Sequence, residues 1–232
     1  MNERLAPELI TEPRQLAPYL QHTLISIGTT REQAIKHAEE TLEHGFDAAM
    51  VAGSVVPVTA DVLRGTGVGI ASALDFPTTG VMTSAGKAAE AAELVRLGAT
   101  QIDIGVQIGW LKDGRYDDFR NDIAGVVACG VPIKVMLELP LLTEAEKEAA
   151  VELSIEAGAA FLKNASSGAI EKASVESISY LVARAPEGVK VKASGGISTF
   201  EHALSLIRAG ASLAGSSNSV AIVTGDAGSD SY

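Results

Sequence analysis

Charged side chains inside short apolar runs are the feature of this sequence that could do chemistry. Asp103 lies in the first of four successive runs, Lys134 and Glu138 in the second, Lys163 in the third and Lys192 in the fourth. Alternate residues of a β-strand point to opposite faces, so these charges lie opposite their Val, Ile and Leu neighbours. We therefore expect the five charged side chains to gather on one side of a sheet.

Buried charges must be paired with opposite charges or change protonation, because an isolated ion in an apolar interior is costly. In this set the lysines outnumber the carboxylates by one. A lysine crowded by another ammonium group loses its proton more readily, and its free amine can attack a carbonyl carbon to form a Schiff base. A nearby carboxylate can relay the protons that this reaction needs. The pattern predicts Schiff-base chemistry on a carbonyl substrate.

The elements that must position these charges are short apolar strands that alternate with segments of helical periodicity. The predicted strands cover residues 20–24, 48–52, 69–73, 101–107, 133–139, 161–165, 189–194 and 213–217. The predicted helices cover residues 30–44, 84–97, 116–128, 143–157 and 199–209, and a glycine follows each of them closely.

This alternation predicts an α/β protein, a single-domain (β/α)8 TIM barrel spanning residues 1–232. We expect a short lead-in over residues 1–19 and a flexible tail over residues 224–232. The apolar strand faces must then pack against helices, so the charges face the lumen. A doubly wound open sheet is the alternative, and it is less favoured because no G-x-G-x-x-G motif follows the first strand.

Glycines and hydroxyls follow the last two strands of the predicted barrel. They are Ser194 at the end of the seventh strand with Gly195 and Gly196 after it, and Gly215, Ser216 and Ser217 at the end of the eighth. TIM barrels often hold a phosphate group at this position, on backbone N–H groups and helix N-termini. We expect a small phosphorylated aldehyde or sugar as the partner.

The composition excludes several classes of function. A formal net charge of −11 over 232 residues argues against nucleic acid or anionic lipid as a partner. One cysteine and four scattered histidines offer neither an internal disulfide nor a metal site, and no cofactor is expected. No signal peptide or membrane span is recognisable, so a cytoplasmic protein is expected. The oligomeric state stays open, with a homodimer as one candidate.

Several segments, in the same order, resemble motifs of the deoxyribose-phosphate aldolase family, the metal-independent class I aldolases that condense acetaldehyde with glyceraldehyde 3-phosphate. Residues 98–103 are similar to the family's GADEID motif, and residues 133–138 with 141–143 to its LKVILE and LLT motifs. Residues 157–163 resemble AGADFVK, and residues 191–197 resemble VKASGGI. The resemblance covers nearly the whole chain and implies a lyase that reversibly cleaves 2-deoxyribose 5-phosphate.

The resemblance also implies a role for individual residues. Lys163 would form the Schiff base, Lys192 would be the neighbouring ammonium that favours the free amine, and Asp103 would relay protons. Some family members use a tail that ends in tyrosine as a proton shuttle, which here would be Tyr232. The expected substrate-binding residues are Gln21, Lys134, Glu138, Asn164, Ser194, Gly195, Gly196, Gly215, Ser216 and Ser217.

The sequence departs from the family's motifs at four strand ends, where a substrate would bind. Gln21 stands where the IDHTLL motif has an acid, and residues 164–168 differ from TSTGF, with the glycine displaced. Residues 50–54 lack the CVNP motif, and Asp75 replaces a usual glycine. Two alternatives stay open: a divergent Schiff-base lyase or synthase for another sugar phosphate or aldehyde, and a barrel that has lost turnover. The intact Schiff-base charges argue against the second.

Overall fold

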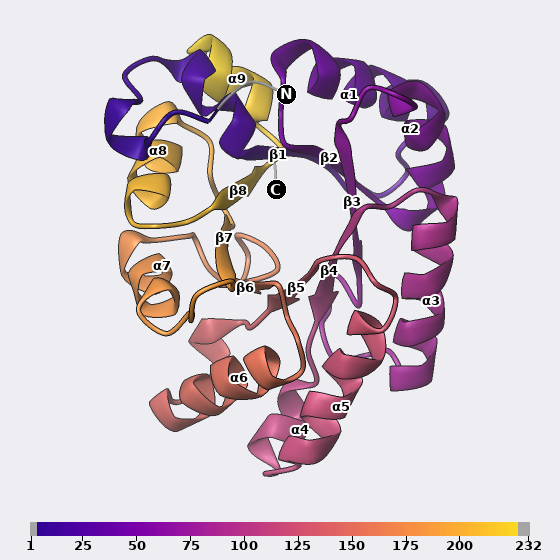
Figure 1. Ribbon diagram of the computed structural model, residues 1–232, viewed down its shortest axis with the longest axis vertical. Coiled ribbons are helices and arrows are strands. Elements are labelled where there is room, and N and C mark those ends of the chain that lie inside the picture. The colour runs from indigo at the N-terminus through magenta and orange to yellow at the C-terminus, as the bar shows by residue number, and fades with distance from the viewer. Residues whose placement is uncertain (1–3, 227–232) are drawn as a thin grey trace.

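The structure of the protein is a computed structural model that describes residues 4–226. Eight parallel strands form a closed barrel, in which each strand pairs with the next and β8 pairs with β1 (Figure 1). This closed order confirms the predicted (β/α)8 TIM barrel and excludes the open sheet. The strands are β1 Leu20–Leu24, β2 Ala48–Val51, β3 Gly69–Leu74, β4 Gln101–Gly105, β5 Ile133–Met136, β6 Phe161–Lys163, β7 Lys190–Ser194 and β8 Leu213–Ser216.

Helices surround the ring of strands, as Figure 1 shows. The α-helices are α1 Arg31–His44, α2 Val56–Leu63, α3 Ser84–Leu97, α4 Ile108–Lys112, α5 Tyr116–Val127, α6 Glu144–Glu156, α7 Val175–Val182, α8 Phe200–Arg208 and α9 Ser219–Thr224. Short 3-10 helices are η1 Pro7–Leu9, η2 Pro13–Tyr19, η3 Gly53–Val55 and η4 Leu139–Leu141. The helical periodicity does not predict α2, α4, α7 or α9, because these helices are too short to show it.

Hydroxyl side chains fix where several helices begin. The Thr30 side chain accepts a hydrogen bond from the backbone N–H of Gln33, whose side chain bonds back to the backbone of Thr30. Thr143 forms the same capping box with Glu146 at the start of α6. These reciprocal bonds satisfy backbone groups that the first helical turn leaves unpaired, and they set the length of the preceding loop.

Apolar clusters lie on both sides of the strands. The larger one lies between the strands and the helices and includes Ile102 and Ile104. The smaller one consists of Ala48, Met50 and Ala71, with Ala73 packed against it, all on β2 and β3. Alternation along β4 therefore places Ile102 and Ile104 under the helices and leaves Asp103 on the lumen side. The lumen is apolar beside β2 and β3 and charged beside β4 to β7.

The N-terminal lead-in packs against the last two helices. It contacts α8 through η1 and α9 through η2, and η2 buries Leu16 and Ala17 (Figure 1). At the other end α9 continues to Thr224, and residues 227–232 lie outside the described part of the chain. In residues 4–226 no helix combines the length and the apolar character needed to cross a membrane.

Three strands end two or three residues earlier than the sequence predicts, and the difference matters for Glu138. The strands β4, β5 and β6 end at Gly105, Met136 and Lys163 rather than at residues 107, 139 and 165. Glu138 has a left-handed backbone with a φ of 52°, which ends the extended conformation. The prediction that Glu138 shares a strand face with Lys134 is therefore wrong, because β5 has ended before it.

Candidate active site

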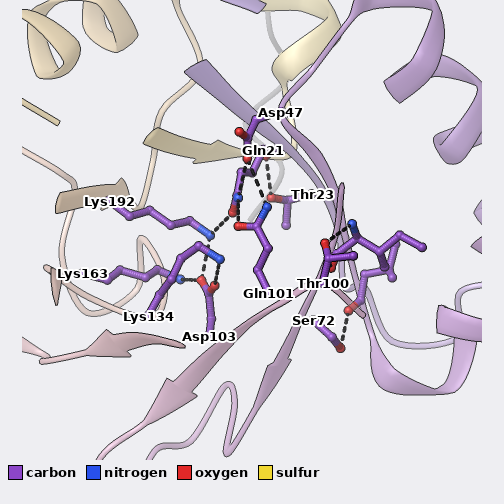
Figure 2. A network of polar contacts seen from close by, with 12 residues as sticks. Gln21, Thr23, Asp47, Ser72, Thr100, Gln101, Asp103, Lys134, Lys163 and Lys192 are labelled. Atoms are coloured by element: carbon purple, nitrogen blue, oxygen red, sulfur yellow. Dashed lines mark hydrogen bonds and ion pairs between the residues drawn. The ribbon is translucent and has the colours of Figure 1, made fainter. Parts of the chain in front are cut away.

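Asp103 on β4 is the centre of a charge cluster in the lumen (Figure 2). Its Oδ2 accepts hydrogen bonds from the Nζ of Lys163 at 2.9 Å and from the Nζ of Lys192 at 2.7 Å. Its Oδ1 lies 3.1 Å from the Nζ of Lys134. The strand register explains this convergence, because Asp103 pairs with Lys134 and Lys163 pairs with Lys192. One carboxylate thus holds lysines from three successive strands.

Burial and mutual repulsion set the protonation of this cluster. Burial raises the pKa of the Asp103 carboxyl, but the ammonium groups of Lys134, Lys192 and Lys163 outweigh burial and hold that pKa well below its usual range. Burial and the repulsion from Lys163 and Lys134 lower the pKa of Lys192 to about 7, although Asp103 opposes this shift. The cluster can therefore give up a proton near neutral pH, which is the condition for a lysine nucleophile.

A cavity opens over the cluster at the carboxyl ends of the strands. Lys163 and Lys192 line it, whereas Asp103 and Lys134 are fully buried and are not among its lining residues. One wall is apolar and consists of Ile25, Met50, Ala73 and Phe76. Only a lysine that reaches the cavity can bond to a substrate, so the candidates are Lys163 and Lys192. Of the two, Lys163 has the more exposed side chain, at 6% against 1%.

Gln21 lies beneath the cluster and is fully buried. Its Oε1 accepts a hydrogen bond from the Nζ of Lys192 at 2.6 Å, and its Nε2 donates to Asp47 Oδ2 and to Gln101 Oε1, both at 2.8 Å. Neither the Gln21 side chain nor the Lys134 side chain lines the cavity, so their expected contact with the substrate stays a prediction. Among the three lysines of the cluster, Gln21 is hydrogen-bonded to Lys192 in the described structure.

Glu138 and Asn164, also expected to bind substrate, instead hold the strand ends around the cavity. Both oxygens of the Glu138 carboxylate accept the backbone N–H of Ser166, at 3.0 and 3.1 Å. Asn164 Nδ2 donates to the carbonyl of Ser194 at 3.0 Å, and its Oδ1 accepts the N–H of Ser194 at 2.9 Å. Ser166 and Ser194 line the cavity, but Glu138 and Asn164 do not. Their contacts in the structure position the strand ends, and their expected contact with the substrate stays a prediction.

The loops after β7 and β8 give the cavity a rim of glycines and hydroxyls. The lining includes Ser194, Gly195, Gly196, Gly215, Ser216 and Ser217, all six of which the sequence pattern places there. Gly195 has a φ of 108°, and a Cβ at this position would collide with the carbonyl oxygen of Glu171. Only glycine therefore permits this close backbone path. Ser216 Oγ donates to the carbonyl of Ile197 at 2.6 Å and so ties the two loops together.

Lys172 is a candidate functional residue that the sequence pattern does not reveal. It is exposed, lies in the loop between β6 and α7, and lines the cavity. Its side chain lies beside Gly196, since a Cβ on that glycine would lie 3.0 Å from Lys172 Cγ. The side chain adds a positive charge at the glycine rim. No alternation or motif marks the residue, because only the folded loop brings it to the cavity.

Asp75 belongs to a second buried ion cluster. The Nζ of Lys87 on α3 lies 2.6 Å from Asp122 Oδ2 and 3.1 Å from Asp75 Oδ2, and it donates to the carbonyl of Gly105 at 2.9 Å. The Asp75 carboxylate also accepts the backbone N–H groups of Gly80, Val81 and Met82. Asp75 thus fixes the loop after β3, which carries Phe76 to the cavity wall.

Two further expectations concern the C-terminal Tyr232 and a metal site. The catalytic role of Tyr232 falls on a residue outside the described part of the chain and stays a prediction. Across residues 4–226, the side chains of His, Cys, Asp and Glu form no group of three that could hold a metal ion.

Comparisons with known proteins point to one group of enzymes. No protein-family model matches the chain. A deoxyribose-phosphate aldolase of Rhodospirillum rubrum is 41% identical over 211 residues, which are 90% of this chain and 88% of the relative. One of Methanothermobacter thermautotrophicus is 39% identical over 213 residues, 91% of this chain and 95% of the relative. Among solved structures, a tetrameric deoxyribose phosphate aldolase from Aeropyrum pernix superposes with a TM-score of 0.86 at 27% identity, covering 94% of each chain.

Proposed function

The chain belongs to the deoxyribose-phosphate aldolase family, and we propose that it cleaves 2-deoxyribose 5-phosphate through a Schiff base on Lys163. It is an aldolase, and therefore a lyase, on a TIM barrel. One observation carries the proposed mechanism: Lys163 and Lys192 donate to the same oxygen of Asp103 at the base of the cavity. This arrangement keeps an amine and an ammonium side by side where a carbonyl can reach them.

The reaction begins when the free amine of Lys163 attacks the aldehyde carbon of the open-chain sugar. The carbinolamine loses water and becomes a protonated imine. A water molecule then takes the proton of the C3 hydroxyl, the C2–C3 bond breaks, and its electron pair forms an enamine on Lys163 as glyceraldehyde 3-phosphate leaves. Protonation of the enamine carbon followed by addition of water releases acetaldehyde and restores the amine.

Asp103 and Lys192 are placed to assist without bonding to the substrate carbon. In this proposal the Asp103 carboxylate, which accepts hydrogen bonds from both amines, relays a proton between them during carbinolamine formation and loss of water. Lys192 contacts the same carboxylate oxygen as Lys163, so in this proposal its ammonium charge lies beside the reacting amine. The proton needed by the leaving water can therefore come from the cluster itself.

The phosphate group binds at the glycine rim in this proposal. The backbone of Gly195 and Gly196 approaches the cavity without side chains, and the Ser216 and Ser217 loop faces it. Backbone N–H groups in such a rim form an anion site. Lys172, which lies beside Gly196, supplies the full positive charge that a dianion requires.

The decisive experiment is borohydride reduction of the protein with 2-deoxyribose 5-phosphate or acetaldehyde, followed by peptide mass spectrometry. A reduced adduct on Lys163 supports the proposal. An adduct on Lys192 or Lys134 contradicts the assigned roles, and the absence of any adduct favours a barrel without turnover. A panel of other sugar phosphates and aldehydes tests the remaining alternative, a divergent Schiff-base enzyme, because the best substrate would then be a different one.

A further inference from the structure

A line of polar contacts leads from the charge cluster toward the N-terminal ends of the strands (Figure 2). Lys192 donates to Gln21 Oε1 at 2.6 Å, and Gln21 Nε2 donates to Asp47 Oδ2 at 2.8 Å. The other oxygen of Asp47 accepts from Arg4 at 2.8 Å, in a pair that is partly exposed. Asp47 directly precedes β2, and the reaction steps described above do not use it.

The Asp47 carboxylate determines which end of the Gln21 amide faces Lys192. A carboxylate can only accept hydrogen bonds, so the amide NH2 must point to it. Gln101 Oε1 accepts the second hydrogen of that NH2 group at 2.8 Å. The Gln21 oxygen is therefore left facing the ammonium. A flipped amide would bring NH2 against the ammonium and oxygen against the carboxylate, and both contacts would be repulsive.

Asp47 also brings a second negative charge near a cluster that is rich in cations. Lys192 is hydrogen-bonded to Asp103 from β4 and Gln21 from β1, and the charges of Lys163 from β6 and Lys134 from β5 also act on it. Asp103 is the one carboxylate in direct contact with these lysines within the described residues. Burial lowers the pKa of Lys134, and the charges of Asp103 and Asp47 both oppose that shift. The field of Asp47 therefore reaches the cluster.

We propose that Asp47 is a positioning residue for the reaction, which orients Gln21 toward Lys192 and helps to keep Lys192 protonated while Lys163 reacts. Gln21 transmits the effect through two hydrogen bonds, while Arg4 holds the far side of the carboxylate. The catalytic meaning of this arrangement rests on the proposed function. Its electrostatic part does not, because the titration of Lys192 can be measured without turnover.

Three variants test the proposal: Asp47→Asn, Gln21→Glu and the double variant. Lysine labelled with ¹³C at Cε reports the titration midpoint of Lys192 by NMR, and the loss of a signal in Lys192→Met assigns it. Asp47→Asn should lower the midpoint by about half a pH unit or more, because it removes negative charge. Gln21→Glu should raise it. The double variant should return close to the wild-type midpoint, because one carboxylate again lies below Lys192, bonded to an amide.

The kcat of Asp47→Asn and of the double variant should change in the same direction as the Lys192 midpoint. Asp47→Asn should lower kcat roughly tenfold with little change in KM, since the cavity is untouched, and the double variant should recover most of the loss. Asp61→Asn is the matched control, because Asp61 is an exposed carboxylate on α2 paired only with Arg64 in the described structure. It changes the net charge equally and should leave the midpoint where it is.

Two results would overturn the proposal. One is an unchanged Lys192 midpoint in Asp47→Asn, and the other is a double variant whose kcat is as low as that of Asp47→Asn or lower. A shifted midpoint in a protein that forms no borohydride adduct would remove the proposed function and leave the electrostatic role of Asp47 intact. Thermal unfolding of each variant establishes that the comparison is made on folded protein.

Discussion

Lys163 and Lys192 donate hydrogen bonds to one and the same oxygen, Oδ2 of Asp103, at 2.9 and 2.7 Å. The two amines come from neighbouring strands and lie opposite each other in the register. Because they share an acceptor in a buried site, the charge on one amine changes the free energy of protonating the other. The reactivity of the lysine that meets the substrate therefore depends on a neighbour that forms no bond to it.

Lys192→Met should remove that influence while keeping a side chain of similar length. We expect kcat/KM at pH 7 to fall on the order of a hundredfold, because the variant lacks the ammonium group that assists the Schiff-base steps. In the wild type, kcat/KM should fall as pH increases through about 7, the pKa to which burial and repulsion lower Lys192, because Lys192 then loses the charge that the proposed mechanism requires. In the variant this fall should be absent. Rates measured across the pH range check this, and the same fall in the variant would contradict the charge role.

Lys172→Met should weaken binding of the phosphorylated substrate and leave the chemical step alone. The side chain lies at the glycine rim, away from the Asp103 cluster, so we expect KM for 2-deoxyribose 5-phosphate to rise about tenfold with kcat nearly constant. A tenfold change corresponds to about 1.4 kcal/mol. Cleavage of unphosphorylated deoxyribose is the internal control and should not change. Equal losses for both sugars would show that Lys172 does not bind phosphate.

The alternation of strands with helices was enough to predict the fold. The alternation of residues along each strand was enough to predict that Asp103 and the lysines face the lumen. The apolar partners of Asp103 and Lys163 pack under helices, and alternation leaves these charges in the lumen. The rule holds only while the strand lasts. It misplaces Glu138, because the chain adopts a left-handed conformation there after β5 has ended. It also cannot give depth along the barrel: Gln21 contacts Lys192 and does not line the cavity.

Residues outside the strands could not be found in this way. Lys172 reaches the cavity through the path of a loop, and Asp47 reaches Gln21 because β1 and β2 are neighbours in the barrel. Both placements depend on tertiary geometry that no local pattern records. The IDHTLL motif carries an acid where this chain has Gln21. Here the Asp47 carboxylate, which accepts a hydrogen bond from Gln21, supplies a negative charge near that position. Such an exchange becomes visible only when the two side chains are seen in contact.

Lys87→Met should destabilise the fold strongly. The Lys87 ammonium is fully buried between Asp75 and Asp122, so its removal leaves two carboxylates without their cation. Breaking a buried ion pair on one side typically costs about 3–5 kcal/mol, and we expect the free energy of unfolding to fall by that amount. Urea denaturation at pH 7 measures it. Lys36→Met, at an exposed pair with Glu40, is the control and should cost less than about 1 kcal/mol.

A stacked pair of buried histidines should make the fold sensitive to acid. The rings of His22 on β1 and His37 on α1 lie 4.1 Å apart between centroids. Burial, and then the nearby charge of His44, lowers the pKa of His22 to about 4. Burial, and then the charge of His22, lowers the pKa of His37 to about 3, although Glu40 opposes this. Both rings are therefore neutral in the folded protein at pH 7.

The sign of the pH effect follows from these two values. Above about pH 6.5, the ordinary value for histidine, the rings are neutral in the folded and unfolded chain alike and pH has no effect through them. Between about pH 6.5 and about pH 4 only the unfolded chain binds the protons, so the free energy of unfolding falls with falling pH. His37→Phe keeps a stacked ring and removes one of these groups. We expect its loss of unfolding free energy between pH 7 and pH 4 to be smaller than that of the wild type by about 2–3 kcal/mol. Urea denaturation of both proteins at the two pH values measures the difference, and equal losses would show that His37 takes up its proton without unfolding.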